Sequence, residues 1–257
     1  MSNARVISVV SPKGGNGKTT VSANLSVSLA RRRPTIVVDL DVHFGDIEYA
    51  LRMRPVHRLD DVVRAHLEGR NNLRGLLTSH PAGLEVLCAP NDPVAADRLD
   101  PNEVFAAIDS LAQDDLPIVL DTAGGISDYS LGALDRATDI VLVCGTDVPS
   151  IQAGKKLLAT MTELAMPLDR IRLVVNRSTA QVGLSAQDVE EVLGLEAALL
   201  VPDHISLAAG MNTGTPVTES SPRSTIADAF NDFADDLLEI EESPRRRFRV
   251  LRQGASQ

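Results

Sequence analysis

A glycine-rich segment near the N-terminus, "SPKGGNGKTT" at residues 11–20, contains the residue types that bind phosphate. It follows the apolar run "RVISVV" and precedes a segment that we expect to be helical, which is the setting of a P-loop. Glycines at 14, 15 and 17 leave backbone N–H groups free to face phosphate oxygens, and the start of the helix adds its positive dipole end. In such a loop Lys18 contacts the β- and γ-phosphates and the Thr19 hydroxyl binds Mg²⁺. The segment therefore predicts a nucleotide-binding loop.

This loop departs from the general P-loop pattern in two ways. The pattern G-x-x-x-x-G-K-[ST] has glycine where this chain has Pro12. The pattern also needs only one lysine, whereas this loop contains Lys13 as well as Lys18. The alternative interpretation is a glycine-rich turn that joins a strand to a helix by chance. The coincidence of strand, paired glycines, lysine and threonine favours the nucleotide-binding loop.

Three aspartates follow other apolar runs and are candidates for phosphoryl-transfer chemistry. Asp39 and Asp41 lie in "VVDLDVHFGD", and Asp121 ends the run "PIVLD". Transfer of a phosphoryl group to water needs one carboxylate near Mg²⁺ and another group that orients the attacking water. An ordinary acidic loop after a strand is the alternative interpretation.

The elements that position these residues are indicated by apolar runs that alternate with helical segments. Most runs are apolar at consecutive positions, which is typical of strands buried on both faces of a parallel sheet. We predict strands at 5–10, 35–40, 84–89, 117–121, 139–145 and 171–176, and a weaker one at 197–202. Helices are predicted at 19–32, 101–113, 149–165, 185–193 and 224–241. The alternation predicts an α/β fold, a doubly wound, mostly parallel sheet with helices on both faces, in one domain.

The predicted domain covers residues 1–242, and a basic C-terminal tail covers residues 243–257. Residues 211–223 are the most loop-like stretch before the tail.

The motif K-G-G-x-G-K-T-T at residues 13–20 resembles the deviant Walker A signature of the MinD/ParA ATPases, which tolerates a residue other than glycine at its first position. The resemblance extends along nearly the whole chain. It implies a P-loop NTPase fold, slow hydrolysis of ATP with Mg²⁺, and an ATP-dependent homodimer. Lys18 would serve its own nucleotide, and Lys13 would reach the phosphates in the partner's site. ATP then becomes a switch for association, because the phosphate charge is neutralised fully only in the dimer.

The same resemblance implies roles for individual residues. Asp41 orients the attacking water, Asp39 lies nearer the metal, and Asp121 is at the Walker B position. The implied catalytic residues are Lys13, Lys18 and Asp41, and the implied metal site is Thr19, Asp39 and Asp121. Gly124 and Gly125 are the implied hinge of a second switch loop.

The nucleotide contacts that the resemblance implies come from three segments. Asn176 contacts adenine, while Pro202 and Asp203 border the base in a segment, "VPDHISLAAGMNTGTPV", that is similar to the closing segment of the family. The loop contacts are Gly14, Gly15, Asn16, Gly17, Lys18, Thr19 and Thr20.

Within the family, "LDVHFGDIEYAL", "RLDDVV" and "GLEVLCAPNDPVAAD" resemble the CpaE/TadZ-type ATPases of pilus assembly. The resemblance implies a switch that positions a Flp or type IV pilus machine together with a partner protein of that machine. Many proteins of that type carry an N-terminal receiver-like domain, whereas the first ATPase strand is expected here at residue 5. Phe44 is interpreted either as a hydrophobic switch contact or as a core residue.

Charge limits the alternative functions. The net charge is −10, and residues 241–257 hold five Arg against two Glu, so that residues 1–240 carry −13. A body this acidic repels DNA phosphates unless basic residues gather in the fold, which disfavours chromosome or plasmid partition without excluding it. A division-site or flagellar-number regulator that attaches to a membrane is a further alternative. The basic tail either contacts anionic lipid as a peripheral anchor, contacts DNA, or has no role.

Composition argues against other classes of protein. Cys88 and Cys144 form no CxxC pair, which disfavours a metal-cluster carrier, and two tyrosines are too few for the tyrosine-rich tail of a bacterial tyrosine kinase. A small-molecule ligase would not need Lys13. The N-terminus does not resemble a signal peptide and no run of eighteen apolar residues occurs, so we expect a cytoplasmic protein.

Overall fold

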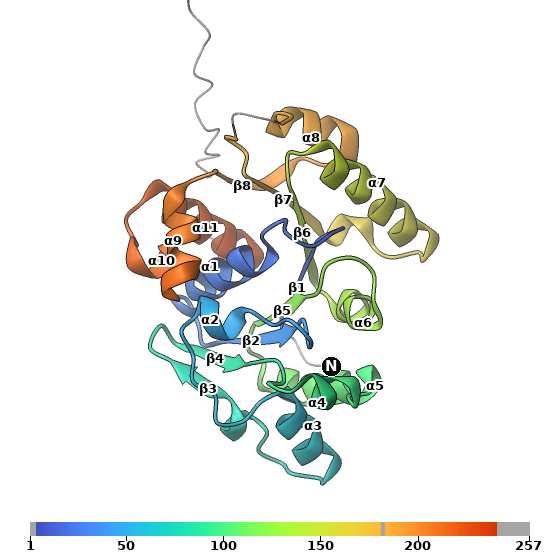
Figure 1. Ribbon diagram of the computed structural model, residues 1–257, viewed down its shortest axis with the longest axis vertical. Coiled ribbons are helices and arrows are strands. Elements are labelled where there is room, and N and C mark those ends of the chain that lie inside the picture. The colour runs from blue at the N-terminus through green and yellow to red at the C-terminus, as the bar shows by residue number, and fades with distance from the viewer. Residues whose placement is uncertain (1–3, 181–182, 241–257) are drawn as a thin grey trace, which may run out of the picture.

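An eight-stranded sheet runs through the middle of the molecule, and helices cover both of its faces (Figure 1). The computed structural model describes residues 4–180 and 183–240. The strand order is β3-β4-β2-β5-β1-β6-β7-β8, and all neighbours pair in parallel except β3 and β4. The strands are β1 Val6–Val10, β2 Thr35–Leu40, β3 Thr78–His80, β4 Leu84–Leu87, β5 Ile118–Thr122, β6 Asp139–Cys144, β7 Ile171–Asn176 and β8 Ala197–Val201. The predicted α/β fold is confirmed.

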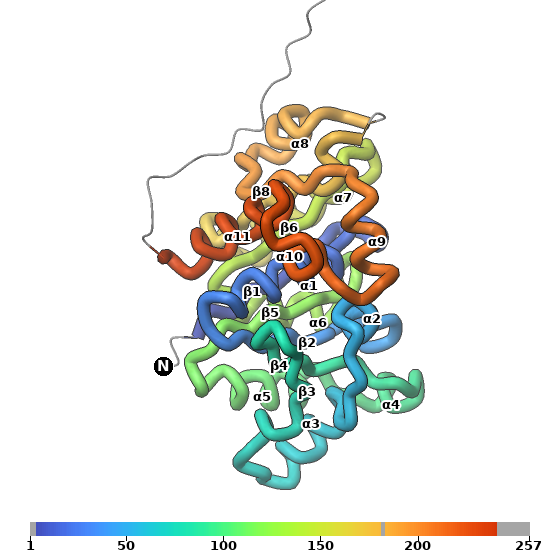
Figure 2. Tube along the Cα trace, turned by 90° about the vertical axis from the view of Figure 1, so that its left-hand side faces the viewer, coloured from blue at the N-terminus to red at the C-terminus, as the bar shows by residue number. Residues whose placement is uncertain are grey.

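The apolar runs form central strands because both of their faces are covered. In β1, Ile7 and Val9 join the core on one side of the sheet, whereas Val6 and Val10 join cores on the other side. On the first side lie α1 Lys18–Ala30, α2 Ile47–Ala50, α9 Ile205–Thr213, α10 Val217–Ser220 and α11 Thr225–Leu237, grouped together in Figure 2. On the other side lie α3 Leu59–Leu67, α4 Pro93–Asp97, α5 Pro101–Leu111, α6 Asp128–Arg136, α7 Val148–Glu163 and α8 Ala186–Leu193. Short 3-10 turns occupy Arg74–Leu76, Ala112–Asp114 and Leu168–Arg170.

All seven predicted strands and all five predicted helices are present, with ends that differ by a few residues. The prediction that 211–223 is the most loop-like stretch holds only for 214–216 and 221–223, because the stretch also contains the end of α9 and all of α10. Thr218 ties this stretch to the fold: its backbone N–H donates to Asn24 Oδ1 on α1 at 3.1 Å. The sequence does not predict β3, which is too short for a pattern and pairs antiparallel at the sheet edge.

The carboxyl ends of the parallel strands meet at one edge of the sheet, so the segments that follow β1, β2, β5, β6, β7 and β8 come together there. This edge holds the predicted site residues, although they are spread over most of the sequence. Among the described residues, no helix combines the length and the apolar character needed to cross a bilayer. The tail at 243–257, with its predicted lipid or DNA contact, lies outside the described residues.

Candidate functional site

The glycine-rich loop joins β1 to α1, and the structure shows which of its glycines the fold requires. Gly17 precedes α1 with a φ of 88°, and a Cβ built on it would lie 2.2 Å from Asn176 Nδ2. Both its conformation and its surroundings therefore exclude a side chain. A Cβ at Gly14 or Gly15 would meet nothing within 4 Å, so the space above them is open to a ligand. Gly124, after β5, packs so closely on the loop that its Cβ would lie 2.4 Å from the Gly14 nitrogen.

Asn16 makes three hydrogen bonds that hold the loop, two of them to other elements. Its Nδ2 donates to Ser11 Oγ at the end of β1 at 2.9 Å, and its Oδ1 accepts from Ser150 Oγ on α7 at 2.8 Å. Its carbonyl oxygen accepts from Asn176 Nδ2 at the end of β7 at 2.8 Å. These contacts order the loop before a ligand binds, so less conformational entropy is lost when the loop binds phosphate.

Asp39 and Asp121 lie side by side at the carboxyl ends of β2 and β5, where the strand register pairs them directly. Both side chains are buried. Asp39 is held by the backbone N–H groups of Asp41 and Ile47, each at 3.1 Å from one of its oxygens. Asp121 Oδ1 accepts from Ser22 Oγ at 2.7 Å, whereas its Oδ2 is buried without a hydrogen-bond partner.

Both carboxyl groups have raised pKa values. Burial raises the pKa of Asp121 to about 6, although the hydroxyls of Ser22 and Thr19 and the ammonium of Lys18 act in the opposite direction. Burial and then the neighbouring charge of Asp121 raise the pKa of Asp39 well above its usual range. Two buried carboxylates side by side need a cation before both can ionise at low cost.

The residues present fit a Mg²⁺ ion. The unpartnered Oδ2 of Asp121 is a hard oxygen ligand in a buried position, and Thr19 lies close enough to affect the pKa of Asp121. The described residues contain no cluster of three or more His, Cys, Asp or Glu that could hold a metal alone. Mg²⁺ commonly takes its remaining ligands from phosphate and water, which is the coordination that a P-loop site supplies.

The Asp121→Asn variant is expected to stabilise the nucleotide-free protein at pH 7 and to abolish the stabilisation that Mg²⁺ adds to nucleotide. The carboxyl pKa is about 6 in the folded protein, whereas its ordinary value is 3.8. The free energy of unfolding therefore falls as the pH rises from about 4 to 6, and at pH 7 the whole destabilisation by the Asp121 charge is present. That cost is about 3 kcal/mol, and it disappears below about pH 4, where the group is neutral in both states. Thermal unfolding at pH 4 and pH 7 measures it.

A matched control is Asp139→Asn. Asp139 is equally buried, but Arg5 Nη1 lies 3.0 Å from its Oδ2, so the loss of this charge should destabilise the fold. An Asp121→Asn protein that unfolds at a lower temperature than the wild type at pH 7 without nucleotide would contradict the expected cost of the Asp121 charge.

The second lysine of the loop, Lys13, is held by its own chain. Its Nζ lies 2.8 Å from Oδ1 of Asp147, the residue that caps the N-terminus of α7. Slight burial raises the pKa of Asp147, but the hydrogen bonds from Lys13 and Ser150 outweigh it and lower the pKa to about 2. Lys13 is therefore paired within its own chain in this structure, at the cavity beside the loop that Lys13 and Asp147 both line.

A cavity of about 380 Å³ adjoins the glycine-rich loop on the side of β7. Asn176 and Asp203 line it, as expected for a base-binding region, whereas Pro202 is not among its lining residues. Arg177 and Asp147 also line it and were not predicted. Asp147 could have been found from the helix-start pattern "DVPS", with a capping Asp and Pro in the first turn. No local signal identifies Arg177.

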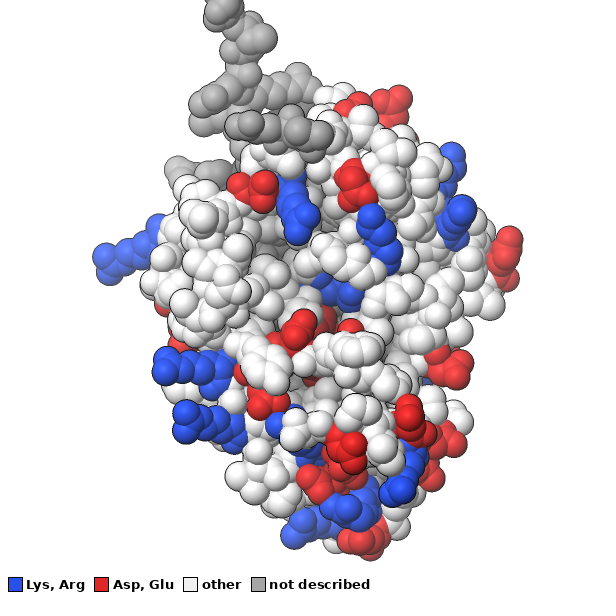
Figure 3. Space-filling view, in the orientation of Figure 1, with Lys and Arg blue, Asp and Glu red and all other residues white. Residues whose placement is uncertain are grey.

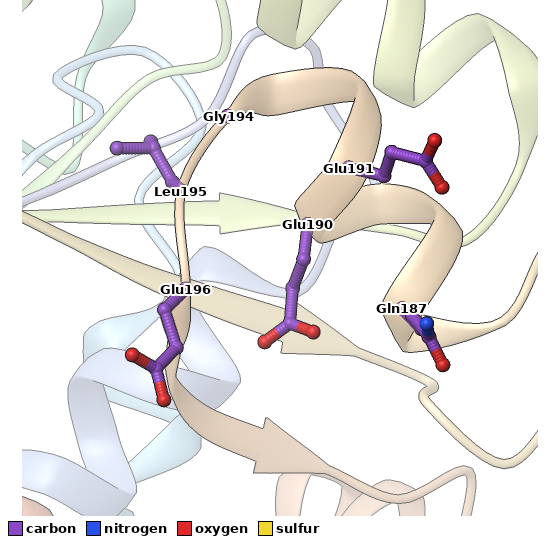
Figure 4. Close-up of a pocket in the computed structure, with 6 residues that line it drawn as sticks. All are labelled: Gln187, Glu190, Glu191, Gly194, Leu195 and Glu196. Atoms are coloured by element: carbon purple, nitrogen blue, oxygen red, sulfur yellow. The ribbon is translucent and has the colours of Figure 1, made fainter.

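Two other features bear on the site. Phe44 is 81% exposed, so its interpretation as a core residue is wrong and the switch contact stays a prediction. A separate hollow between α8 and β8 presents Glu190, Glu191 and Glu196 (Figure 4). Its carboxylates repel phosphate, so the cavity beside the glycine-rich loop is the candidate nucleotide site.

The geometry at the carboxyl edge of the sheet is that of a P-loop nucleotide-binding protein, because an open glycine-rich loop leads into α1 and the buried Asp121 carboxylate, with one unpartnered oxygen, lies close to Lys18 and Thr19. The CbiA family model, described as the CobQ/CobB/MinD/ParA nucleotide binding domain, matches residues 7–217. The chain belongs to this family and is an ATP-binding ATPase of the MinD/ParA kind.

Three relatives span most of the chain. An uncharacterized ATP-binding protein of Methanocaldococcus jannaschii is 30% identical, over 91% of this chain and 88% of the relative. Antiactivator FleN of Pseudomonas aeruginosa is 28% identical, over 95% and 91%. The septum site-determining protein MinD of Thermotoga maritima is 27% identical, over 83% and 80%.

Solved structures confirm the fold. MinD of Pyrococcus horikoshii, in complex with Mg-ADP, superposes with a TM-score of 0.79 at 24% identity, over 91% of this chain and 96% of that chain. The MinC:MinD cell division protein complex of Aquifex aeolicus gives a TM-score of 0.78 at 23% identity, over 95% and 99%.

Proposed function

We propose that this chain is a Mg²⁺- and ATP-dependent switch that dimerises on ATP, hydrolyses it slowly and thereby positions a cellular assembly. The observation that carries the proposal is the separate placement of the two lysines of one loop. Lys18 is buried inside its own site, whereas the Lys13 side chain lies on the rim and is 40% exposed. A second cation on the rim supports a contact with phosphates held by another copy.

Exposed apolar side chains around the loop support an interface with a second copy. Phe44 follows β2, Ile126 follows β5, Val148 opens α7 after β6, and Ile205 opens α9 after β8. All four belong to the carboxyl edge of the sheet, where the nucleotide site lies. Burial of such side chains contributes roughly 25 cal/mol per Å² of apolar surface.

The relatives support the division-site or flagellar-number function better than pilus assembly. The names of two of them are septum site-determining protein MinD and antiactivator FleN, and none of the relatives given above is named as a pilus protein. The CpaE/TadZ resemblance therefore has no support from them. We propose that the positioned assembly belongs to the division or flagellar machinery. MinD of Aquifex aeolicus forms a complex with MinC, and here too we propose a partner protein that recognises the ATP-bound dimer.

Partition on DNA has less support. On the face shown in Figure 3, basic and acidic side chains are interspersed rather than gathered into a basic stripe. Residues 1–240 also carry a net charge of −13, from a total of −10 and +3 in the segment that follows.

Light scattering of the wild type tests the proposal. The protein is expected to be a monomer without nucleotide and with ADP, and a dimer with ATP and Mg²⁺. A monomer in all conditions would show that ATP does not control association. The Asp41→Ala variant, held in the ATP state, then serves to capture and identify the partner protein.

The Asp147→Asn variant is expected to tighten the ATP-dependent dimer about two- to fivefold, because Lys13 no longer has to leave an ion pair in its own chain. Asparagine caps a helix as well as aspartate does, so α7 should stay intact. Sedimentation equilibrium with ATP measures the dimer constant. Asp100→Asn, which changes the cap of α5 away from the loop, is the control. Dimerisation that is unchanged or weaker in Asp147→Asn would mean that the ion pair does not restrain Lys13.

A further inference from the structure

Asn176, at the end of β7, holds the glycine-rich loop from the side of the base cavity. Its Nδ2 donates to the carbonyl oxygen of Asn16 at 2.8 Å, and its Oδ1 accepts from the backbone N–H of Arg177 at 2.9 Å. Its side chain is buried, and it packs so closely on Gly17 that any side chain there would collide with it. The amide therefore contacts both residues of the peptide unit that leads into α1.

We propose that Asn176 is a positioning residue for phosphate binding: it fixes the Asn16–Gly17 peptide unit, and thus the loop that follows, whatever base the nucleotide carries. This inference rests on the proposed nucleotide site and adds to the adenine contact that the resemblance implies. The other two anchors of the loop, from Ser11 and Ser150, hold the side chain of Asn16 and not its carbonyl oxygen. Loss of the Asn176 amide removes the hydrogen bond that this carbonyl makes with β7.

The hydrogen-bonding capacity of the amide couples the two halves of the site. A side-chain amide can donate two hydrogen bonds and accept two. The fold uses one donor and one acceptor of Asn176, so one of each remains for the edge of a base. A single rigid group then contacts the loop and borders the cavity at the same time, so that a base bound there is held in a defined position relative to the phosphate cradle.

The test compares ATP with inorganic tripolyphosphate, which has the phosphates but no base. Binding of each, with Mg²⁺, is measured by calorimetry for the wild type and for Asn176→Ala. The positioning role predicts that tripolyphosphate affinity falls about tenfold and that ATP affinity falls by at least that factor, because ATP also loses the contact of the amide with the base. If Asn176 contacts only the base, ATP affinity falls and tripolyphosphate affinity is unchanged, which would overturn the proposal. Should Asn176→Ala not fold, Asn176→Ser keeps a polar group that is too short to reach the Asn16 carbonyl.

Asn24→Ala is the matched control, because Asn24 is also a buried amide that donates to a carbonyl, that of Thr20, at 2.8 Å. This variant should lower thermal stability but leave the tripolyphosphate affinity of the folded protein unchanged. An equal loss in both variants would mean that the effect is general loosening and not positioning.

Binding of the two ligands to the wild type distinguishes a failure of the proposed function from a failure of the proposed role of Asn176. Failure to bind either ligand would contradict the proposed function itself. Binding of ATP without tripolyphosphate would overturn only the role of Asn176, because the loop would then not be set for phosphate in the absence of a base.

Discussion

The Lys18→Ala variant is expected to lose at least about a hundredfold in affinity for ATP, because charge-assisted contacts to phosphate are among the strongest hydrogen bonds in proteins. Lys18 is the first residue of α1, and its side chain is buried close to Asp121, whose pKa its charge lowers. Without the ammonium, the phosphates of a bound nucleotide would face two buried carboxylates with one cation fewer. The loss should therefore exceed that of a single neutral hydrogen bond.

Calorimetry with ATP and Mg²⁺ measures this effect, and thermal unfolding without nucleotide checks that the variant is folded. Lys155→Ala is the control, since this lysine is exposed on α7. Full ATP affinity in Lys18→Ala would mean that the glycine-rich loop is not a phosphate site, and both the proposed function and the role of Asn176 would then fall.

The Lys13→Ala variant is expected to bind ATP as a monomer and to hydrolyse it at least about a thousandfold more slowly than the wild type, by analogy with cations supplied in trans to other phosphoryl-transfer sites. Lys13 lies on the rim, paired with Asp147, so its removal leaves the phosphate cradle of its own chain intact. What is lost is the charge that a second copy would bring. Light scattering and a phosphate-release assay measure the two effects. Equal dimerisation of the variant and the wild type would exclude the contact across the interface.

The Asp41→Ala variant should behave in the opposite way and accumulate as an ATP-bound dimer. Asp41 is only partly buried, and its Oδ1 accepts from the Phe44 backbone N–H at 3.3 Å. The water-orienting role behind this prediction is the one that the family resemblance implies. A dimer that dissociates at the wild-type rate when ATP is exhausted would show that Asp41 has no part in hydrolysis.

The nucleotide loop and the strands around it could be predicted from sequence because their signals are local. Consecutive apolar residues mark a strand buried on both faces, and β1, β2 and β7 follow that pattern within a residue. The need for glycine at position 17 also has a local part, since φ is positive there. Short or polar elements carry no such signal. The residues of β3 form a strand only because they pair with β4. The helix α10 forms in a stretch of turn-like residues because Asn24 on α1 accepts a hydrogen bond from its backbone.

The sequence by itself determined that this chain has a P-loop with two lysines, aspartates at strand ends and an α/β sheet. Only the tertiary structure decided which of those residues meet. Asp39 and Asp121 become a pair because β2 lies beside β5, and Lys13 meets Asp147 because β1 lies beside β6. Asn176 reaches Asn16, 160 positions away, through the same convergence of strand ends. The physical reason is that the apolar pattern and the backbone geometry of an element depend on residues that are close in sequence. The order of the strands depends instead on the packing of the whole sheet, and that order decides which residues meet at the carboxyl ends of the strands.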